Sequence, residues 1–104
     1  MYVMVFITCP DAESGARIAR TLVEKGLAAC VNLVKGVKSV YRWKGKVEEA
    51  DEVLLIAKTR ASLVEQLKEE VKAIHPYQVP EVVCTPITAA LEEYVRWLEE
   101  STQS

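Results

Sequence analysis

The segment that decides the fold is residues 27–58, LAACVNLVKGVKSVYRWKGKVEEADEVLLIAK. Two extended stretches, at about 27–43 and 47–58, flank Lys44-Gly45-Lys46, which has the composition of a hairpin tip. Lys35-Gly36 interrupts the first stretch and predicts a bulge or kink. At about 3.3 Å per residue, arms of about 14 residues reach on the order of 45 Å. A chain of 104 residues has a radius of gyration of about 13 Å, so we expect the hairpin to project and to pair with a neighbouring subunit.

Helical patterns lie on both sides of this hairpin. Asp11 is expected to cap a first helix, which ends before Gly26, because glycine is favoured just after a helix. Thr59 is expected to cap a second helix, and Pro76 ends it near His75, because proline disfavours helical geometry in the preceding residue. The residues expected to face the core are Ala12, Ala16, Ala19, Leu22 and Val23 in the first helix, and Leu63, Val64, Leu67, Val71 and Ile74 in the second.

Strand patterns lie outside the two helices. Residues 2–8 and 82–87 are apolar, β-branched runs, and Pro86 predicts that the second is an edge or bulged strand. Thr88 is expected to cap a last helix. The order β-α-β-β-α-β with a terminal helix predicts one α+β domain over residues 1–104, a ferredoxin-like split-βαβ sandwich with an extended hairpin and a C-terminal helix.

The strands carry more apolar residues than one covered face requires. The two main helices can cover only one face of the sheet, yet residues 2–8, 53–57 and 82–87 are apolar at nearly every position. Something must therefore cover the second face, and the sequence predicts a homo-oligomer.

Composition excludes several classes of protein. The net charge of −2 and the pI near 5.5 argue against a nucleic-acid partner. Three cysteines without a CxxC spacing make neither a disulfide framework nor a zinc ribbon, and they indicate a reducing compartment. The N-terminal run lacks the basic region of a signal peptide, and no run is long enough to span a membrane. We expect a cytoplasmic protein without a membrane partner.

The residues 74–81, IHPYQVPE, concentrate chemically useful groups. They hold the only histidine of the chain, His75, together with Tyr77, Glu81 and two prolines. A histidine at a rigid junction between helix and strand is either a site residue or a cap for the last carbonyls of the helix.

Six collinear motifs of this chain resemble the CutA divalent-cation tolerance family. They are Thr8-Cys9-Pro10-Asp11, Leu27-Ala28-Ala29-Cys30-Val31-Asn32, Tyr41-Arg42-Trp43-Lys44-Gly45, Lys58-Thr59, His75-Pro76-Tyr77-Gln78-Val79-Pro80-Glu81 and Tyr94-Val95-Arg96-Trp97-Leu98. The resemblance implies a ferredoxin-like homotrimer assembled by strand pairing between subunits. It also implies a cytosolic role in tolerance of copper and other divalent metals, and it supplies no catalytic reaction.

The resemblance places a ligand site in the cleft between subunits. The residues it implies as ligand-binding are Lys58, Tyr77, Glu81, Tyr94 and Trp97, with Asn32 and Thr59 beside them. His75, Cys30 and Cys9 are the candidate metal ligands, because imidazole and thiolate suit copper. Ile74 stands where some relatives carry a second histidine, so one subunit cannot supply a site with two histidines.

Two other functions compete with metal binding. An enzyme could use Cys30, His75 and Glu81 as nucleophile, base and orienting group. The chain has no P-loop, no GxGxxG and no arginine-bearing phosphate loop after the first strand, so we expect no catalytic residues.

The second competitor is a signalling module of the PII type, which binds a nucleotide or another small anion between subunits. Lys58, Arg60 and His75 could serve such an anion. Mutations distinguish the metal-binding hypothesis from the anion-binding one. A metal-binding protein should lose its metal on His75→Ala, whereas an anion-binding protein should lose its ligand chiefly on Lys58→Ala.

Overall fold

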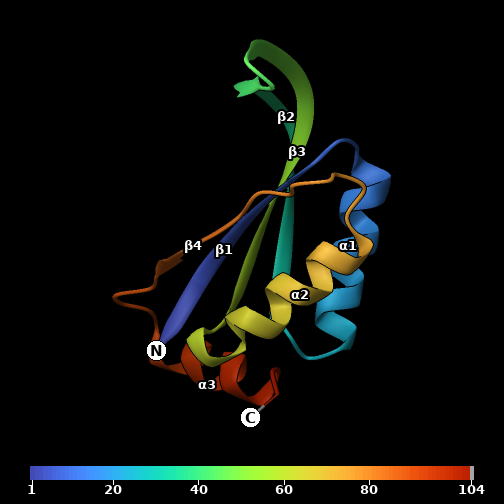
Figure 1. Cartoon of the computed structure of the whole chain (residues 1–104). Coiled ribbons are helices and arrows are strands. Elements are labelled where there is room, and N and C mark those ends of the chain that lie inside the picture. The colour runs from blue at the N-terminus through green and yellow to red at the C-terminus, as the bar shows by residue number, and fades with distance from the viewer. Residues whose placement is uncertain (104) are drawn as a thin grey trace.

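Four strands and three α-helices make up the fold of the computed structural model, which describes residues 1–103. In chain order they are β1 (Tyr2–Cys9), α1 (Ala12–Glu24), β2 (Cys30–Trp43), β3 (Lys46–Arg60), a 3-10 turn (Ala61–Leu63), α2 (Val64–Ile74), β4 (Val82–Pro86) and α3 (Glu92–Glu100). The strands form one antiparallel sheet in the order β2-β3-β1-β4. Figure 1 shows α1 and α2 on the same face of this sheet. The predicted ferredoxin-like order is confirmed, and β4 is an edge strand as expected.

The hydrophobic core lies between these two helices and one face of the sheet. In β1 the side chains alternate: Val5, Ile7 and Cys9 are fully buried in the core. The residues between them remain partly exposed on the other face, which we call the open face. The open face carries Tyr2, Met4 and Phe6 of β1 and Leu54 and Ile56 of β3. About half of the apolar residues of β1 and of the C-terminal part of β3 therefore pack within this chain, and no residue of β4 is buried.

Helix α1 begins as the sequence predicts but buries a different face. The Asp11 carboxylate accepts a hydrogen bond from the Ser14 N–H at 2.7 Å, which satisfies a free donor of the first turn. Ser14, Gly15, Ile18 and Leu22 face the core, whereas the predicted core residues Ala16 and Val23 are exposed. Small residues, and not only apolar ones, allow the helix to approach the sheet.

For the other two helices, the predicted end of α2 is confirmed and both predicted N-caps are wrong. α2 ends at Ile74, directly before an extended His75, as Pro76 requires. Thr59 does not cap α2: it lies inside β3, fully buried, and its hydroxyl donates to the Leu27 carbonyl at 2.7 Å. A buried carbonyl needs a donor more than the exposed start of a helix does. Thr88 does not cap α3 either, because that helix begins at Glu92 after an extended Leu91.

The hairpin of β2 and β3 projects from the domain. Lys44 and Gly45 join the strands with φ of 51° and 81°, the positive pair that a tight hairpin turn requires. The predicted bulge is present, because the register shifts between Val34 and Val37. The molecule measures 44 Å along its longest axis, and Figure 1 shows the hairpin reaching beyond the rest of the chain. The predicted overhang is confirmed.

Helix α3 closes one end of the sheet. Tyr2 on β1 donates its hydroxyl to Glu99, and the Arg60 Nε on β3 donates to the Thr102 hydroxyl at 2.9 Å. These contacts hold α3 against the end of the open face where β1 begins. Within residues 1–103, no helix is long and apolar enough to cross a membrane.

Candidate functional site

His75 joins the end of α2 to the end of β1. Its Nδ1 accepts a hydrogen bond from the Tyr77 N–H at 3.0 Å, and its Nε2 lies 2.8 Å from the Thr8 carbonyl oxygen. Because a backbone N–H can only donate, Nδ1 carries no proton, and Nε2–H donates to Thr8. Only 8% of the residue is exposed. Both ring nitrogens are occupied, so His75 neither caps the carbonyls of α2 nor offers a free nitrogen to a ligand.

Tyr77 extends this contact to the hairpin. Its ring lies 4.8 Å from the His75 ring, centroid to centroid, and its hydroxyl donates to the Glu52 carboxylate of β3 at 2.6 Å. Burial and the bond to Glu52 raise the pKa of the Tyr77 hydroxyl far above its usual value. Tyr77 is therefore held as a neutral donor at every ordinary pH.

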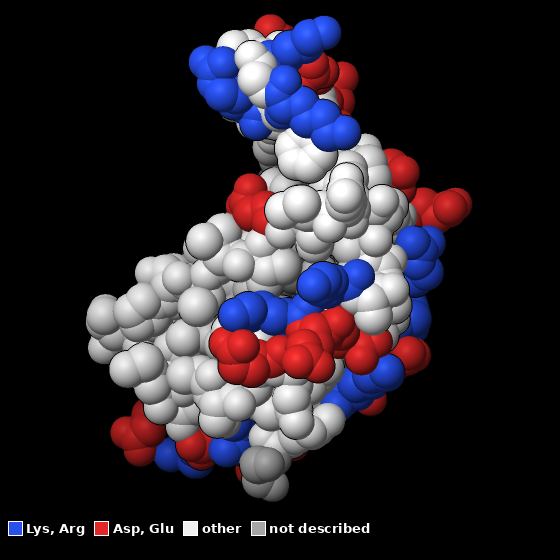
Figure 2. All heavy atoms as spheres, in the orientation of Figure 1, with Lys and Arg blue, Asp and Glu red and all other residues white. Residues whose placement is uncertain are grey.

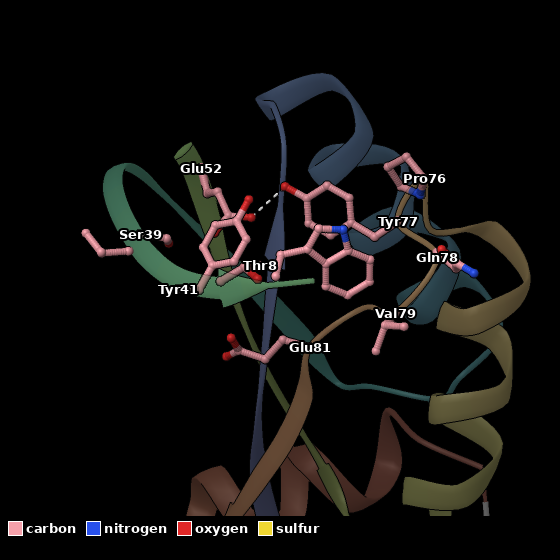
Figure 3. Close-up of a pocket in the computed structure, with 11 residues that line it drawn as sticks. Thr8, Ser39, Tyr41, Glu52, Pro76, Tyr77, Gln78, Val79 and Glu81 are labelled. Atoms are coloured by element: carbon pink, nitrogen blue, oxygen red, sulfur yellow. Dashed lines mark hydrogen bonds between the residues drawn. The ribbon is translucent and has the colours of Figure 1, made fainter. Parts of the chain in front are cut away.

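A cleft of about 650 Å³ opens between the hairpin and the segment 76–81. Figure 3 shows Tyr41 and Glu52 on one side of this space and Tyr77 on the other, with Val79 and Glu81 below them in the view. Trp43 completes the aromatic wall, and among residues 1–103 no lysine, arginine or histidine side chain lines the cleft. The cleft is therefore aromatic and acidic.

A second cluster lies near the other end of the sheet, on the open face. Lys58 of β3 donates to the Asn32 side chain, and the Cys30 sulfur lies 3.6 Å from the Tyr94 hydroxyl of α3. The Tyr94 and Trp97 rings are 5.3 Å apart. Burial and the contact with Cys30 raise the pKa of Tyr94 to about 12.

The structure divides the predicted ligand-binding residues between these two places. Tyr77 and Glu81 line the cleft, whereas Lys58, Tyr94 and Trp97 lie at or beside the second cluster. Glu52 and Lys58 are six positions apart on β3 and are therefore separated by about 20 Å, at about 3.3 Å per residue. One chain thus keeps the two groups apart.

The predicted metal ligands do not converge within one chain. Cys9 pairs with Val53 and Cys30 with Lys58, so about 17 Å of strand separates them, and they lie on opposite faces of the sheet. Burial raises the pKa of the Cys9 thiol to about 11, which disfavours the thiolate that binds metals. Among residues 1–103 no group of three or more His, Cys, Asp or Glu side chains is placed to hold a metal ion. A resident metal does not fit the residues of a single chain.

Sequence reasoning missed part of the cleft. It did not select Tyr41, Trp43 or Glu52 as ligand-binding residues. The only sequence signal is indirect: Glu52 is the last charged residue before an apolar run, and Tyr41 and Trp43 share one side of the hairpin by strand alternation.

Comparison with known proteins gives a consistent picture. The family described as CutA1 divalent ion tolerance protein matches residues 3–101. The chain is 52% identical over 99 residues to the divalent-cation tolerance protein CutA of Thermus thermophilus, which covers 95% of this chain and 96% of that protein. It is 49% identical over 102 residues to the chloroplastic protein CutA of Arabidopsis thaliana, covering 98% of this chain but only 56% of that longer protein.

Solved structures agree with the sequence relatives. The structure of the divalent cation tolerance protein from Thermus thermophilus matches with a TM-score of 0.96 and 50% identity, covering 99% of this chain and 100% of that one. A protein of Archaeoglobus fulgidus named as a periplasmic divalent cation tolerance protein matches with a TM-score of 0.96 and 41% identity, covering 99% and 100%. These names describe tolerance proteins and specify no reaction.

Proposed function

The chain belongs to the CutA1 divalent ion tolerance protein family, and from that premise we propose that it is a non-catalytic homotrimer that binds copper or another divalent cation between its subunits. The family name supports a role in divalent-cation tolerance.

The observation that carries the proposal is the apolar surface of the single chain. Val40 and Val47 of the hairpin and Val83 of β4 are 63%, 64% and 53% exposed. Figure 2 shows a broad surface without charged side chains on the side of the molecule where β4 lies. Soluble monomers rarely expose large apolar patches. A projecting hairpin and an uncharged edge strand together favour assembly by strand pairing, as the family resemblance implies.

Two contacts support a non-catalytic role. An enzyme using Cys30, His75 and Glu81 would need the imidazole beside the thiol. His75 instead donates to Thr8, and Cys30 contacts Tyr94.

Cys30 is the proposed metal ligand that can act without rearrangement. Its sulfur lies on a partly exposed residue beside α3, and thiolates favour copper. His75 would have to give up two hydrogen bonds, and Cys9 its place in the core. We therefore place the cation at an inter-subunit site to which Cys30 contributes and for which a second subunit supplies the remaining ligands.

The compartment and the extent of the domain are part of the proposal. Three free cysteines support a reducing compartment, which we propose is the cytoplasm. The relatives differ in this respect, since one is named chloroplastic and another periplasmic. We propose that residues 1–104 form one domain.

One observation favours the alternative of a PII-like module that binds a small anion. Lys58 lies on the open face near Tyr94 and Trp97, so a cation and two aromatic rings occur in one region. Arg60, the other predicted anion ligand, already donates to the Glu99 carbonyl and to Thr102. Lys58 is thus the residue on which this alternative depends.

Native mass spectrometry of untagged protein purified without chelator tests both the assembly and the ligand. Three chains of 11.6 kDa amount to about 35 kDa, and a species with the mass of one chain would contradict the trimer. Titration with Cu(II) should give about one ion per subunit. Cys30→Ser should lose that ion, whereas Cys84→Ser, the matched control on β4, should keep it. Nucleotide adducts that vanish in Lys58→Ala, with no specific copper, would instead support the PII-like alternative.

A further inference from the structure

We propose that the hydrogen bond from Tyr77 to Glu52 is a latch that fixes the direction of the hairpin before the chain meets its neighbours, which makes Tyr77 a positioning residue for assembly. The latch deepens the proposed function, and its role rests on the proposed trimer. It is a contact within one chain, so it does not depend on the surface that a neighbouring subunit covers.

The part of the hairpin that leaves the sheet is a ribbon of two strands. β1 pairs with β3 only from Arg60 back to Val53, so among the described residues the stretch 46–52 of β3 has only β2 beside it in the sheet. We call residues 37–52 the outer hairpin. A two-stranded ribbon on its own is marginally stable. Its direction relative to the sheet therefore needs a contact from outside the ribbon.

The outer hairpin begins at a bulge. The register shifts between Val34 and Val37, and Gly36 between them has a φ of 79°. A Cβ placed on Gly36 would have no atom of residues 1–103 within 4 Å, so no side chain of the same chain packs against that side of the backbone. Because a bulge bends a strand and increases its twist, the direction of the outer hairpin can change at this root.

Glu52 lies at the same root, because it pairs with Val37. The residue is 8% exposed in the single chain, and assembly can only add to that burial. Its carboxylate accepts a hydrogen bond from the Tyr77 hydroxyl at 2.6 Å (Figure 3). Apart from the pairing of β2 with β3, no other hydrogen bond or ion pair within residues 1–103 joins the outer hairpin to the rest of the chain. A buried bond to a carboxylate is stronger than a neutral one in water, which suits a latch.

Tyr77 is itself held to the end of β1. Its N–H donates to the His75 Nδ1 at 3.0 Å, and the His75 Nε2–H donates to the Thr8 carbonyl at 2.8 Å. Burial and the bond to Glu52 raise the pKa of the Tyr77 hydroxyl far above its usual value, so the hydroxyl keeps the proton that it donates. Three hydrogen bonds in series therefore run from β1 to the root of the outer hairpin.

A latched hairpin should associate faster than a free one. In the proposed trimer the hairpin pairs with a neighbouring chain, and a group that is ordered beforehand loses less conformational freedom on binding. The loss of one hydrogen bond to a charged group corresponds to a factor of about ten or more in an equilibrium constant. We therefore expect the latch to act on the association of chains and not only on the stability of one chain.

The test follows the assembly of metal-free, untagged protein after dilution from guanidinium chloride, by light scattering at several protein concentrations. The rate of folding of a single chain does not depend on concentration, whereas the rate of association rises with it. Tyr77→Phe removes only the hydroxyl and should slow the concentration-dependent step at least about fivefold. Its helical circular dichroism should recover as in the unaltered protein.

Substitutions of glutamate identify the bond. Glu52→Leu removes the acceptor and should slow association as Tyr77→Phe does, and the double variant should be no slower than either single one, because both changes break the same bond. Glu52→Gln keeps an acceptor and should associate at nearly the unaltered rate. The matched control is Glu70→Leu on α2, away from the hairpin, where the same substitution breaks the bond with Lys25. It should associate as the unaltered protein does.

Three results would overturn the latch and leave the proposed trimer intact. They are an unchanged association rate in Tyr77→Phe, equal slowing in Glu70→Leu, and additive slowing in the double variant. An unaltered protein that keeps the mass of one chain at every concentration would overturn the trimer and the latch with it. If Tyr77→Phe does not recover its helical circular dichroism, Glu52→Leu takes its place, and association of Glu52→Leu at the unaltered rate contradicts the proposal.

Discussion

At the scale of single residues, His75 illustrates how a structural task competes with a ligand role. The only histidine of the chain sits beside a proline and a tyrosine, where sequence reasoning expects either a metal ligand or a helix cap. In the fold its two ring nitrogens tie the segment after α2 to the end of β1. A residue that looks free in the sequence is thus fully engaged by partners from two directions.

We expect His75→Ala to destabilise the protein by about 1–3 kcal/mol, because it leaves the Thr8 carbonyl and the Tyr77 N–H without their partner. Urea unfolding at fixed protein concentration measures the change in the free energy of unfolding. His75→Gln, which keeps a donor and an acceptor, should recover part of the loss. Equal stability of the alanine variant and the unaltered protein would show that the ring bonds contribute nothing.

The buried Cys9 thiol should make the stability of the protein depend on pH in the alkaline range. Burial, followed by the nearby carboxylates of Glu52 and Asp11, raises the pKa of its thiol from 9.0 to about 11. Between these two values the unfolded chain loses the thiol proton and the folded protein keeps it. The free energy of unfolding should therefore fall as the pH rises from about 9 to about 11.

Comparison with Cys9→Ala isolates this contribution from tyrosines and lysines that titrate in the same range. The urea midpoint of the unaltered protein should fall more steeply with pH than that of the variant. Parallel curves would mean that the thiol ionises equally in both states.

At the scale of elements, α1 shows what apolar periodicity overlooks. The spacing of alanines and aliphatic residues predicts a buried stripe through Ala16 and Val23, both of which are exposed. The helix instead turns Ser14 and Gly15 to the sheet. Small side chains let the helix axis come close to β3, and a pattern that scores only apolar residues does not register them.

Gly15→Ala sets two known effects against each other. Alanine improves helix propensity by about 1 kcal/mol over glycine. A Cβ at this position would lie 3.0 Å from Val53 Cγ2 and 3.2 Å from Leu33 Cδ1, and overpacking a core costs about 1–3 kcal/mol. Because Val53 is itself buried, we expect net destabilisation of about 1 kcal/mol, measured by urea unfolding.

The exposed Ala16 supplies the control for Gly15→Ala. Ala16→Gly should cost about 1 kcal/mol through propensity alone, which calibrates that contribution in the same helix. A stability gain in Gly15→Ala would show that the side chains of β2 and β3 move aside freely.

At the scale of the whole molecule, the hairpin and the open face leave the single chain incomplete. The β2–β3 hairpin gives the molecule its length of 44 Å against 25 and 22 Å in the other directions. Its outer part carries exposed Val40 and Val47, and the open face leaves Met4 and Phe6 partly uncovered. These surfaces are the physical basis for the proposed trimer.

Shortening the hairpin tests this basis. Val37 pairs with Glu52, so residues 38–51 can be replaced by Asn-Gly, which forms a tight two-residue turn. We expect this variant to keep its helical circular dichroism but to have the native mass of one chain, because the outer arms no longer reach a neighbour. Gly45→Asn, which keeps the hairpin and places a residue tolerant of positive φ at its tip, should assemble like the unaltered protein. A shortened variant that still assembles would assign the trimer contacts to the open face alone.

Some residues of the candidate site could be selected from the sequence, whereas others could be found only from the fold. The segment 75–81 and Cys30 could be selected from residue types and motif spacing, because these are local properties. Tyr41 and Glu52 could not, since their place in the cleft depends on how the bulged hairpin meets the segment after α2. Nor does the sequence reveal that Lys58 and Tyr77 lie at different ends of the sheet of one chain.

By itself the sequence determined the order of strands and helices, the hairpin and its bulge, the cap at Asp11 and the end of α2. Each of these depends on backbone preferences and side-chain spacing within a few residues. Only the tertiary structure decided that Thr59 serves Leu27, that His75 binds Thr8 and that Tyr77 reaches Glu52. These partners lie 32, 67 and 25 residues apart, so sheet register and helix packing, and not local propensity, bring them together.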